Sequence, residues 1–159
     1  MRRKLRYYWG IDPGLSGWLA IADSESEHVH LYPLCNFDAT FWHIRDQQEI
    51  CPPDKIVLEE IPPAFGKFRR GSKANHELPR SIGWIEMAVY SMELRWDSLV
   101  PRRWQALAGC TGGGKDRNYE RALELFPDSG ITKAQADAVL LAWVARKIAE
   151  EENGRPDSE

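Results

Sequence analysis

The chain has 159 residues, about the size of one domain with a core of its own. Hydrophobic residues make up 43% of it, and no apolar run approaches the roughly 20 residues that a membrane-spanning helix needs. Its three cysteines form no C-x-x-C pair, which argues against a disulfide framework and against a zinc knuckle. The formal net charge of −3 does not by itself suggest a nucleic-acid partner.

Alternating and β-branched or aromatic residues in the first quarter of the chain predict strands near residues 6–12, 17–23 and 28–34, joined by turns. Asp38 can cap a helix that runs to about Glu49 and ends before Pro52. A short buried strand that contains IVLEE follows over residues 55–60. A long basic loop, IPPAFGKFRRGSKANHELPR, comes after it.

The second half of the chain alternates helix and strand. We expect a helix over about Pro79–Arg95, a strand over residues 98–100, a short helix with Trp104 in the core, a helix over about 116–125 and a last helix from Thr132 to about Glu150. Thr132 and Gln135 form the T-x-x-Q pattern of a capping box. These elements predict an α/β fold with a mixed sheet and helices packed on its faces. One domain covers residues 1–149, and residues 150–159 are expected to be a disordered acidic tail.

Three acidic residues occupy positions where apolar residues are expected. Asp12 ends the first strand within GIDPGLSG, and Glu59 ends the strand IVLEE. Asp137 is followed by apolar residues at i+3, i+4, i+7 and i+11, which places it on the apolar face of the last helix. Each acid has a structural explanation of its own, as a turn residue, an ion-pair partner or a charge near a helix N-terminus.

The three acids together are better explained by a common ligand. Unpaired carboxylates that lie close together repel each other and are costly to bury without a positive partner. Mg²⁺ prefers carboxylate and water oxygens, and two such ions can support phosphodiester hydrolysis. We therefore expect Asp12, Glu59 and Asp137 to bind Mg²⁺, with Mn²⁺ as a substitute.

Basic residues gather in three clusters although the net charge is negative, and such clusters can hold a phosphate backbone around an acidic site. A merely solvated surface is the alternative explanation. The clusters are Arg2, Arg3, Lys4 and Arg6; Lys67, Arg69, Arg70, Lys73 and Arg80; and Arg102, Arg103, Lys115, Arg117 and Arg121.

The motifs GIDPGLSG, VLEE and QADAVLLAWVA resemble the three acid-bearing motifs of the RuvC-type Holliday junction resolvases, in the ribonuclease H-like superfamily. The resemblance extends from about Tyr8 to Lys147. SIGWIEMAVY, LVPRRWQ and KDRNYERALELFP are closer to the chloroplast and phage branch of that group. The resemblance to this family implies a ribonuclease H-like fold, with a five-stranded mixed sheet in the order 3-2-1-4-5 and helices on both faces.

Carried over by position, the resemblance makes Asp12, Glu59 and Asp137 metal ligands and places Lys115 near the scissile phosphate. It makes the segment from Pro62 to Arg80 the region that grips the junction. The DNA-binding residues that we expect are Phe65, Lys67, Phe68, Arg69, Arg70, Lys73, Arg80, Arg102, Arg103, Lys115 and Arg117. For Phe65 and Phe68, packing within the loop is the alternative.

The last helix departs from the family pattern. RuvC-type enzymes usually carry a second acid or a histidine one turn before the final aspartate, where this chain has Lys133 and Ala134. On a helix that begins at Thr132, Lys133 lies on the same face as Asp137 and could pair with it. We therefore include Lys133 among the catalytic residues, as a source of positive charge in place of a tightly held second ion.

These features predict an endonuclease that resolves four-way DNA junctions and leaves 5′-phosphate and 3′-hydroxyl ends. The resemblance implies a homodimer, for which Ile82, Trp84, Ile85 and Met92 of the helix over Pro79–Arg95 are interface candidates. We expect no nucleotide cofactor, no membrane association, and a cytoplasmic or organellar location. The alternatives are a nuclease acting on RNA or RNA–DNA hybrids and a non-catalytic junction-binding protein. A phosphotransferase of the sugar kinase type would need a second domain.

Overall fold

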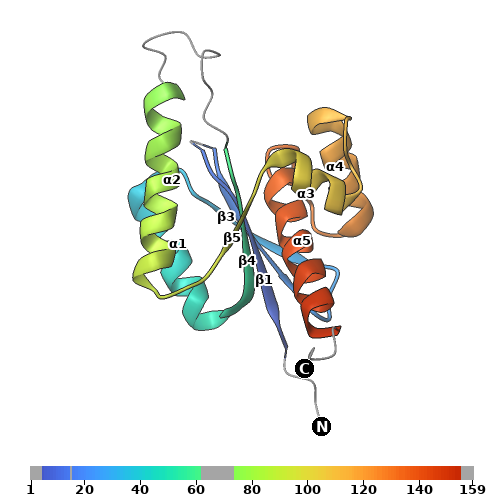
Figure 1. Cartoon of the computed structure of the whole chain (residues 1–159), viewed down its shortest axis with the longest axis horizontal. Helices are drawn as coiled ribbons and strands as arrows, with labels where there is room; N and C mark the ends of the chain where they lie inside the picture. Colours follow the sequence, from blue (N-terminus) through green and yellow to red (C-terminus); the bar gives the residue numbers. More distant parts are fainter. Residues whose placement is uncertain (1–4, 15, 62–73, 155–159) are drawn as a thin grey trace, which may run out of the picture.

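The computed structural model of the chain describes residues 5–14, 16–61 and 74–154. Five strands and five helices follow one another along it (Figure 1). They are β1 (Tyr7–Asp12), β2 (Trp18–Asp23), β3 (Val29–Pro33), α1 (Phe37–Ile50), β4 (Pro53–Glu59), α2 (Ala74–Ser91), β5 (Asp97–Leu99), α3 (Pro101–Ala108), α4 (Gly114–Leu125) and α5 (Ala136–Gly154).

The strands form one mixed sheet in the order β3-β2-β1-β4-β5, as the sequence predicts. β1, β2 and β3 pair antiparallel through short turns, whereas β4 and β5 join parallel to β1 after helical crossovers. Because β1 and β4 are parallel neighbours, their carboxyl ends lie side by side at the same edge of the sheet. Asp12 and Glu59 are the last residues of these two strands.

Helices cover both faces of the sheet, α1 and α2 on one and α3, α4 and α5 on the other (Figure 1). Each face has its own hydrophobic core. The alternation of β1 sends Tyr8 to the α5 side and Trp9 and Ile11 to the α1–α2 side. By the same alternation Asp12 belongs to the face that α5 covers. Val57 of β4 lies in the core on the same face, and Glu59, two residues further along the strand, therefore lies on that face too.

α5 crosses the middle of the sheet at close range because β1 has no side chain at Gly10. A Cβ atom there would collide with the backbone of Ala138 and Ala142. A small residue lets the backbones of two elements approach in this way. The first turn of α5 is thereby held over the end of β1, where Asp12 lies.

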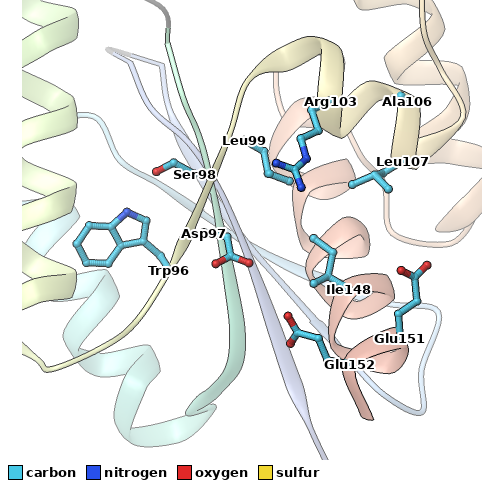
Figure 2. Close-up of a pocket in the computed structure, with 10 residues that line it drawn as sticks. All are labelled: Trp96, Asp97, Ser98, Leu99, Arg103, Ala106, Leu107, Ile148, Glu151 and Glu152. Carbon is cyan, nitrogen blue, oxygen red and sulfur yellow. The ribbon is translucent and has the colours of Figure 1, made fainter. Parts of the chain in front are cut away.

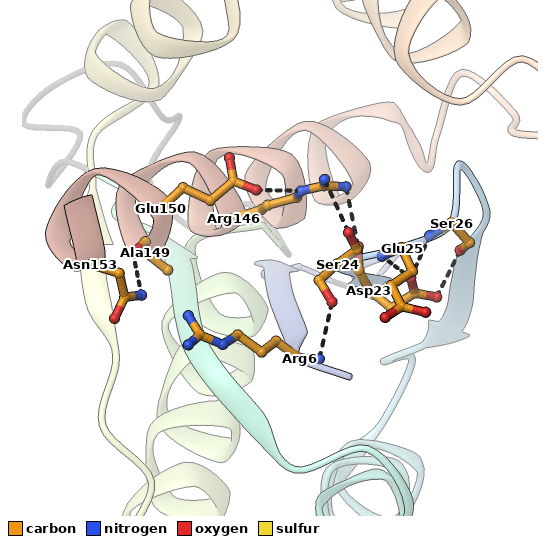
Figure 3. A network of polar contacts seen from close by, with 9 residues as sticks. All are labelled: Arg6, Asp23, Ser24, Glu25, Ser26, Arg146, Ala149, Glu150 and Asn153. Atoms are coloured by element: carbon orange, nitrogen blue, oxygen red, sulfur yellow. Dashed lines mark hydrogen bonds and ion pairs between the residues drawn. The ribbon is translucent and has the colours of Figure 1, made fainter. Parts of the chain in front are cut away.

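The middle of α5 is tied to the turn between β2 and β3 (Figure 3). The guanidinium of Arg146 donates to the carbonyl oxygens of Asp23 at 3.2 Å and Ser24 at 3.3 Å. It also donates to Glu150 Oε1 at 2.9 Å. These contacts fix the rotation of α5 about its axis and therefore which of its residues face the sheet. Among the helices of the described residues, none has the length and hydrophobicity of a membrane-crossing segment.

Two predicted helix starts are wrong. α1 is capped by Asn36, whose side chain accepts from the Ala39 backbone N–H, whereas Asp38 lies in the first turn. α2 begins at Ala74, before Pro79, and ends at Ser91, before the predicted end at Arg95. Pro79, where the predicted helix starts, lies inside the helix.

The predicted boundaries of α5 are also wrong. Residues 133–135 form a turn, and the helix begins at Ala136 rather than at Thr132. The expected capping contact exists but closes this turn: Gln135 Oε1 accepts from the Thr132 backbone N–H at 2.8 Å. At its far end α5 continues to Gly154, so residues 150–154 are helical where a disordered tail is predicted. Residues 155–159 lie outside the described part of the chain.

Candidate active site

Three partly buried acids meet at the carboxyl edge of the sheet. Asp12 and Glu59 end two adjacent parallel strands, and Asp137 is the second residue of α5. The register pairs Ile11 with Leu58, so the next residues along, Asp12 and Glu59, are neighbours on the α5 face. The structure therefore brings together the three acids that the sequence singles out.

Burial and mutual repulsion dominate the electrostatics of these acids. Burial, followed by the negative charges of Glu59 and Asp137, raises the pKa of Asp12 to about 8. Burial also raises the pKa of Glu59, and the charge of Asp137 adds to it, while hydrogen bonds from Trp104 and Asp12 oppose the shift. Both pKa shifts favour the protonated form of Asp12 beside Glu59 at neutral pH.

Two neutral donors hold the other carboxylate oxygens. Trp104 is fully buried on α3, and its indole Nε1–H donates to Glu59 Oε1 at 3.0 Å. Asn118 on α4 is 2% exposed, and its Nδ2 donates to Asp137 Oδ1 at 2.8 Å. Sequence reasoning places Trp104 in the core, which is confirmed, but misses both residues as parts of the site. Asn118 could have been found as a polar residue four positions before Ala122 on the buried side of α4.

Lys115 lies beside these acids. It follows Gly114 at the start of α4, and its Nζ is 3.9 Å from Asp137 Oδ2. Its side chain is 71% exposed, so the ammonium can meet a ligand that approaches from solvent. Its charge lowers the pKa of Asp12, against the larger effects of burial and the other acids.

Lys133 does not pair with Asp137, and this part of the sequence interpretation is wrong. Since α5 begins only at Ala136, Lys133 lies in the preceding turn and not one helical turn from Asp137. Its ammonium forms an ion pair with Asp116 of α4 instead. Asp137 finds its cation in Lys115.

The acids suit a hard divalent cation by their chemistry, though not by their present arrangement. All three offer carboxylate oxygens, the donors that Mg²⁺ and Mn²⁺ prefer, and a cation would relieve their repulsion. In the described part of the chain, no three His, Cys, Asp or Glu side chains are arranged to hold a metal as they stand. Because carboxylates bind metals in their ionised form, a bound cation would lower the raised pKa of Asp12.

Apart from Lys115 and Arg103, the predicted DNA-binding residues fall into three groups. Phe65, Lys67, Phe68, Arg69, Arg70 and Lys73 lie outside the described residues. Arg80 and Arg102 are exposed. Arg117 is paired with acids of its own helix, Glu120 at 3.5 Å and Glu124 at 3.1 Å, so its charge is largely compensated at the surface.

Arg103 is exposed and lines a groove of about 650 Å³ between β5, α3 and α5 (Figure 2). Asp97, Glu151 and Glu152 also line this groove. Lys55 bridges Asp97 at 2.9 Å and Glu152 at 2.8 Å. Because its lining is rich in acids, this groove is a poor place for a phosphate backbone.

No protein-family model and no curated protein sequence matches the chain. Solved structures do match. The Thermus thermophilus RuvC in complex with a Holliday junction substrate has a TM-score of 0.70 and 17% identity over 95% of this chain and 99% of that one. A second Thermus thermophilus RuvC structure has a TM-score of 0.67 and 17% identity, over 92% and 96%.

The yeast mitochondrial Holliday junction resolvase Ydc2 is similar at a TM-score of 0.56 and 14% identity, over 91% of this chain and 80% of that one. The fold of the chain is thus the ribonuclease H-like fold of these resolvases. The closer resemblance to the chloroplast and phage branch stays a prediction.

Proposed function

We propose that this protein is a divalent-metal-dependent endonuclease that cuts four-way DNA junctions. The observation that carries the proposal is the meeting of Asp12, Glu59 and Asp137 at one edge of a sheet with the resolvase topology. One protein of the same fold has been solved with a Holliday junction as its substrate. The fold alone does not imply this activity, so the acids support it independently.

Asp12, Glu59 and Asp137 are the residues that would hold the metal. Bound divalent cations would supply an activated water and stabilise the leaving oxygen, leaving 5′-phosphate and 3′-hydroxyl ends. The exposed ammonium of Lys115, beside Asp137, would contact the scissile phosphate and stabilise the negative charge that develops on it. Trp104 and Asn118 keep Glu59 and Asp137 in place from α3 and α4.

A homodimer formed through α2 would place two such sites on two strands of a junction. On this helix Met87 is 50% and Tyr90 is 78% exposed, three residues apart and therefore on one face. Gly83, four residues before Met87, has open space around it, so a partner could approach closely there. An exposed apolar patch of this kind is typical of an interaction surface.

Two of the residues predicted for this interface face the core instead. Ile85 is 1% exposed, and Met92 packs against the same core between the sheet and helices α1 and α2. The apolar residues of an amphipathic helix are first of all those that face the core. Ile82 and Trp84, the other two predicted residues, are half-buried, and the proposed dimer surface is Gly83, Met87 and Tyr90.

The proposal is tested by incubating the protein with Mg²⁺ and four substrates: a mobile four-way junction, a Y-shaped fork, a linear duplex and an RNA–DNA hybrid. We expect symmetric nicks in the junction alone. Asp12→Asn should abolish cleavage and retain binding. Asp38→Asn, which changes an exposed acid of α1, should cleave like the wild type.

The other outcomes separate the rival functions. Preferential cutting of the hybrid would make the protein a ribonuclease of the same fold. Tight junction binding without any cleavage in Mg²⁺ or Mn²⁺ would make it a binding protein. Equal cutting of linear duplex would rule out structure-selective resolution.

A further inference from the structure

Asn118 is a buried polar residue, and the packing of the fold does not explain why a polar side chain is buried at this position. It is 2% exposed, on the side of α4 that also buries Ala122. A buried amide destabilises a fold unless its groups are hydrogen-bonded. Among the described residues its Oδ1 has no hydrogen-bond partner, although it lies out of contact with solvent. An apolar residue would fill this position at lower cost.

The one side-chain hydrogen bond of Asn118 is directed at the acidic site. Its Nδ2 donates to Asp137 Oδ1 at 2.8 Å, from a helix that packs beside α5. The other oxygen, Asp137 Oδ2, is the one that lies 3.9 Å from Lys115 Nζ. Asn118 therefore fixes the carboxylate plane of Asp137 and leaves Oδ2 available.

The amide is also suited to this task by its lack of charge. A fourth acid at this place would add to the repulsion that already acts on Asp12. A lysine or arginine would compete with a cation for the carboxylates. A neutral donor orients Asp137 with neither effect. Partners that orient a metal ligand from outside its coordination sphere commonly act in this way.

We propose that Asn118 is a positioning residue of the metal site. It donates a hydrogen bond to Asp137 Oδ1 and so orients Asp137 Oδ2 to bind the divalent cation. The inference rests on the proposed function, because it takes Asp137 to be a metal ligand. It adds a residue of α4 to a site that the sequence assigned to β1, β4 and α5.

The test measures binding of Mn²⁺ alone to the full chain by titration calorimetry, beside thermal unfolding in EDTA. We expect Asn118→Leu to weaken Mn²⁺ affinity by about 10- to 100-fold. Its unfolding temperature in EDTA should stay close to that of the wild type, because the substitution removes an unpaired buried oxygen together with the hydrogen bond to Asp137. A residue with a merely structural role would lower both.

The matched control is Thr40→Val, a polar-to-apolar change at a residue of α1 that is 1% exposed on the opposite side of the sheet. It should leave Mn²⁺ affinity within about twofold of the wild type, because it lies far from the acids. If Asn118→Leu does not fold, Asn118→Ser, whose hydroxyl is too short to reach Asp137, replaces it with the same expected loss of affinity.

Unchanged Mn²⁺ affinity in the folded variant would overturn the role of Asn118, whatever the protein cleaves. A loss of affinity matched by a loss of stability in EDTA would overturn it as well. If the variant loses Mn²⁺ affinity alone and the wild type cuts no junction, the proposed function fails and the role of Asn118 stands. Failure of the wild type to bind Mn²⁺ would overturn both.

Discussion

The backbone of Gly10 in β1 lies directly against the backbone of Ala138 in α5, with no room for a side chain between them. Ala138 follows Asp137, and Gly10 precedes Asp12 by two residues on the same face of β1. The closeness of these two elements therefore sets the separation of the two acids.

Gly10→Ala should for this reason damage both the fold and the site. The added methyl group has to displace α5, and overpacking of a core costs about 1–3 kcal/mol. Urea unfolding should show this loss, and Mn²⁺ affinity should fall because Asp137 moves with the helix. The control is Gly154→Ala, where the space for a Cβ atom is open, and it should change stability by less than about 0.5 kcal/mol. Wild-type stability in Gly10→Ala would contradict the close approach.

Asp12→Asn should stabilise the metal-free protein, increasingly so at higher pH. The pKa of Asp12 is raised to about 8 in the folded chain from an ordinary value of 3.8, so the folded state holds a proton that the unfolded state has lost. Stability from this group is complete below the unfolded pKa and is lost as pH rises toward 8. The asparagine side chain of the variant is uncharged at every pH, so the variant does not lose this stability. We expect a gain of about 1–3 kcal/mol at pH 8, from thermal unfolding in EDTA.

In Mn²⁺ the same measurement should show the wild type to be more stable than Asp12→Asn, the reverse of the order in EDTA. A bound cation stabilises the wild type by mass action, and Asp12→Asn lacks one of its ligands. If Asp12→Asn is less stable than the wild type in EDTA at pH 8, burial and the repulsion among the acids do not raise the pKa of Asp12 as described.

Lys115 and Lys133 should differ sharply in their contribution to cleavage. Lys115 lies beside Asp137, so Lys115→Ala should reduce junction cleavage by about 10²-fold, the usual cost of one charge-stabilising group. Lys133 pairs with Asp116 at the surface, so Lys133→Ala should change stability by less than about 1 kcal/mol and leave the Mg²⁺ requirement unaltered. Single-turnover kinetics would measure both. An equal loss of cleavage in the two variants would show that Lys133 contributes to the active site as Lys115 does.

Tyr90→Glu should disrupt the proposed dimer. The side chain is 78% exposed beside Met87, and a carboxylate facing its own copy across a two-fold axis repels it. Light scattering after size-exclusion chromatography would show a shift from dimer to monomer with the fold intact. Ile50→Glu, at another exposed apolar residue, 67% exposed at the end of α1, should leave the mass unchanged. A wild-type protein of monomer mass would exclude the proposed surface.

The order of the elements could be predicted from the sequence because each strand and helix carries its own periodicity. The positions of Asp12 and Glu59 were predictable for the same reason, since both come at the end of a hydrophobic strand. The start of α5 was not, because the T-x-x-Q pattern at Thr132 and Gln135 serves equally well to cap a helix or to close a turn. Because α5 begins at Ala136, Lys133 pairs with Asp116 and not with Asp137 as predicted.

By itself the sequence determined the strands, most of the helices and three acids that would be costly to bury alone, because these depend on residue type and local spacing. Only the tertiary structure decided what surrounds the acids. Trp104 and Asn118 lie on helices that are distant in sequence from Glu59 and Asp137, and their hydrogen bonds depend on how α3 and α4 pack beside α5. Contacts of this kind leave no periodic signal in a single chain. They arise from the closeness of the elements, which in this fold the bare backbone of Gly10 permits.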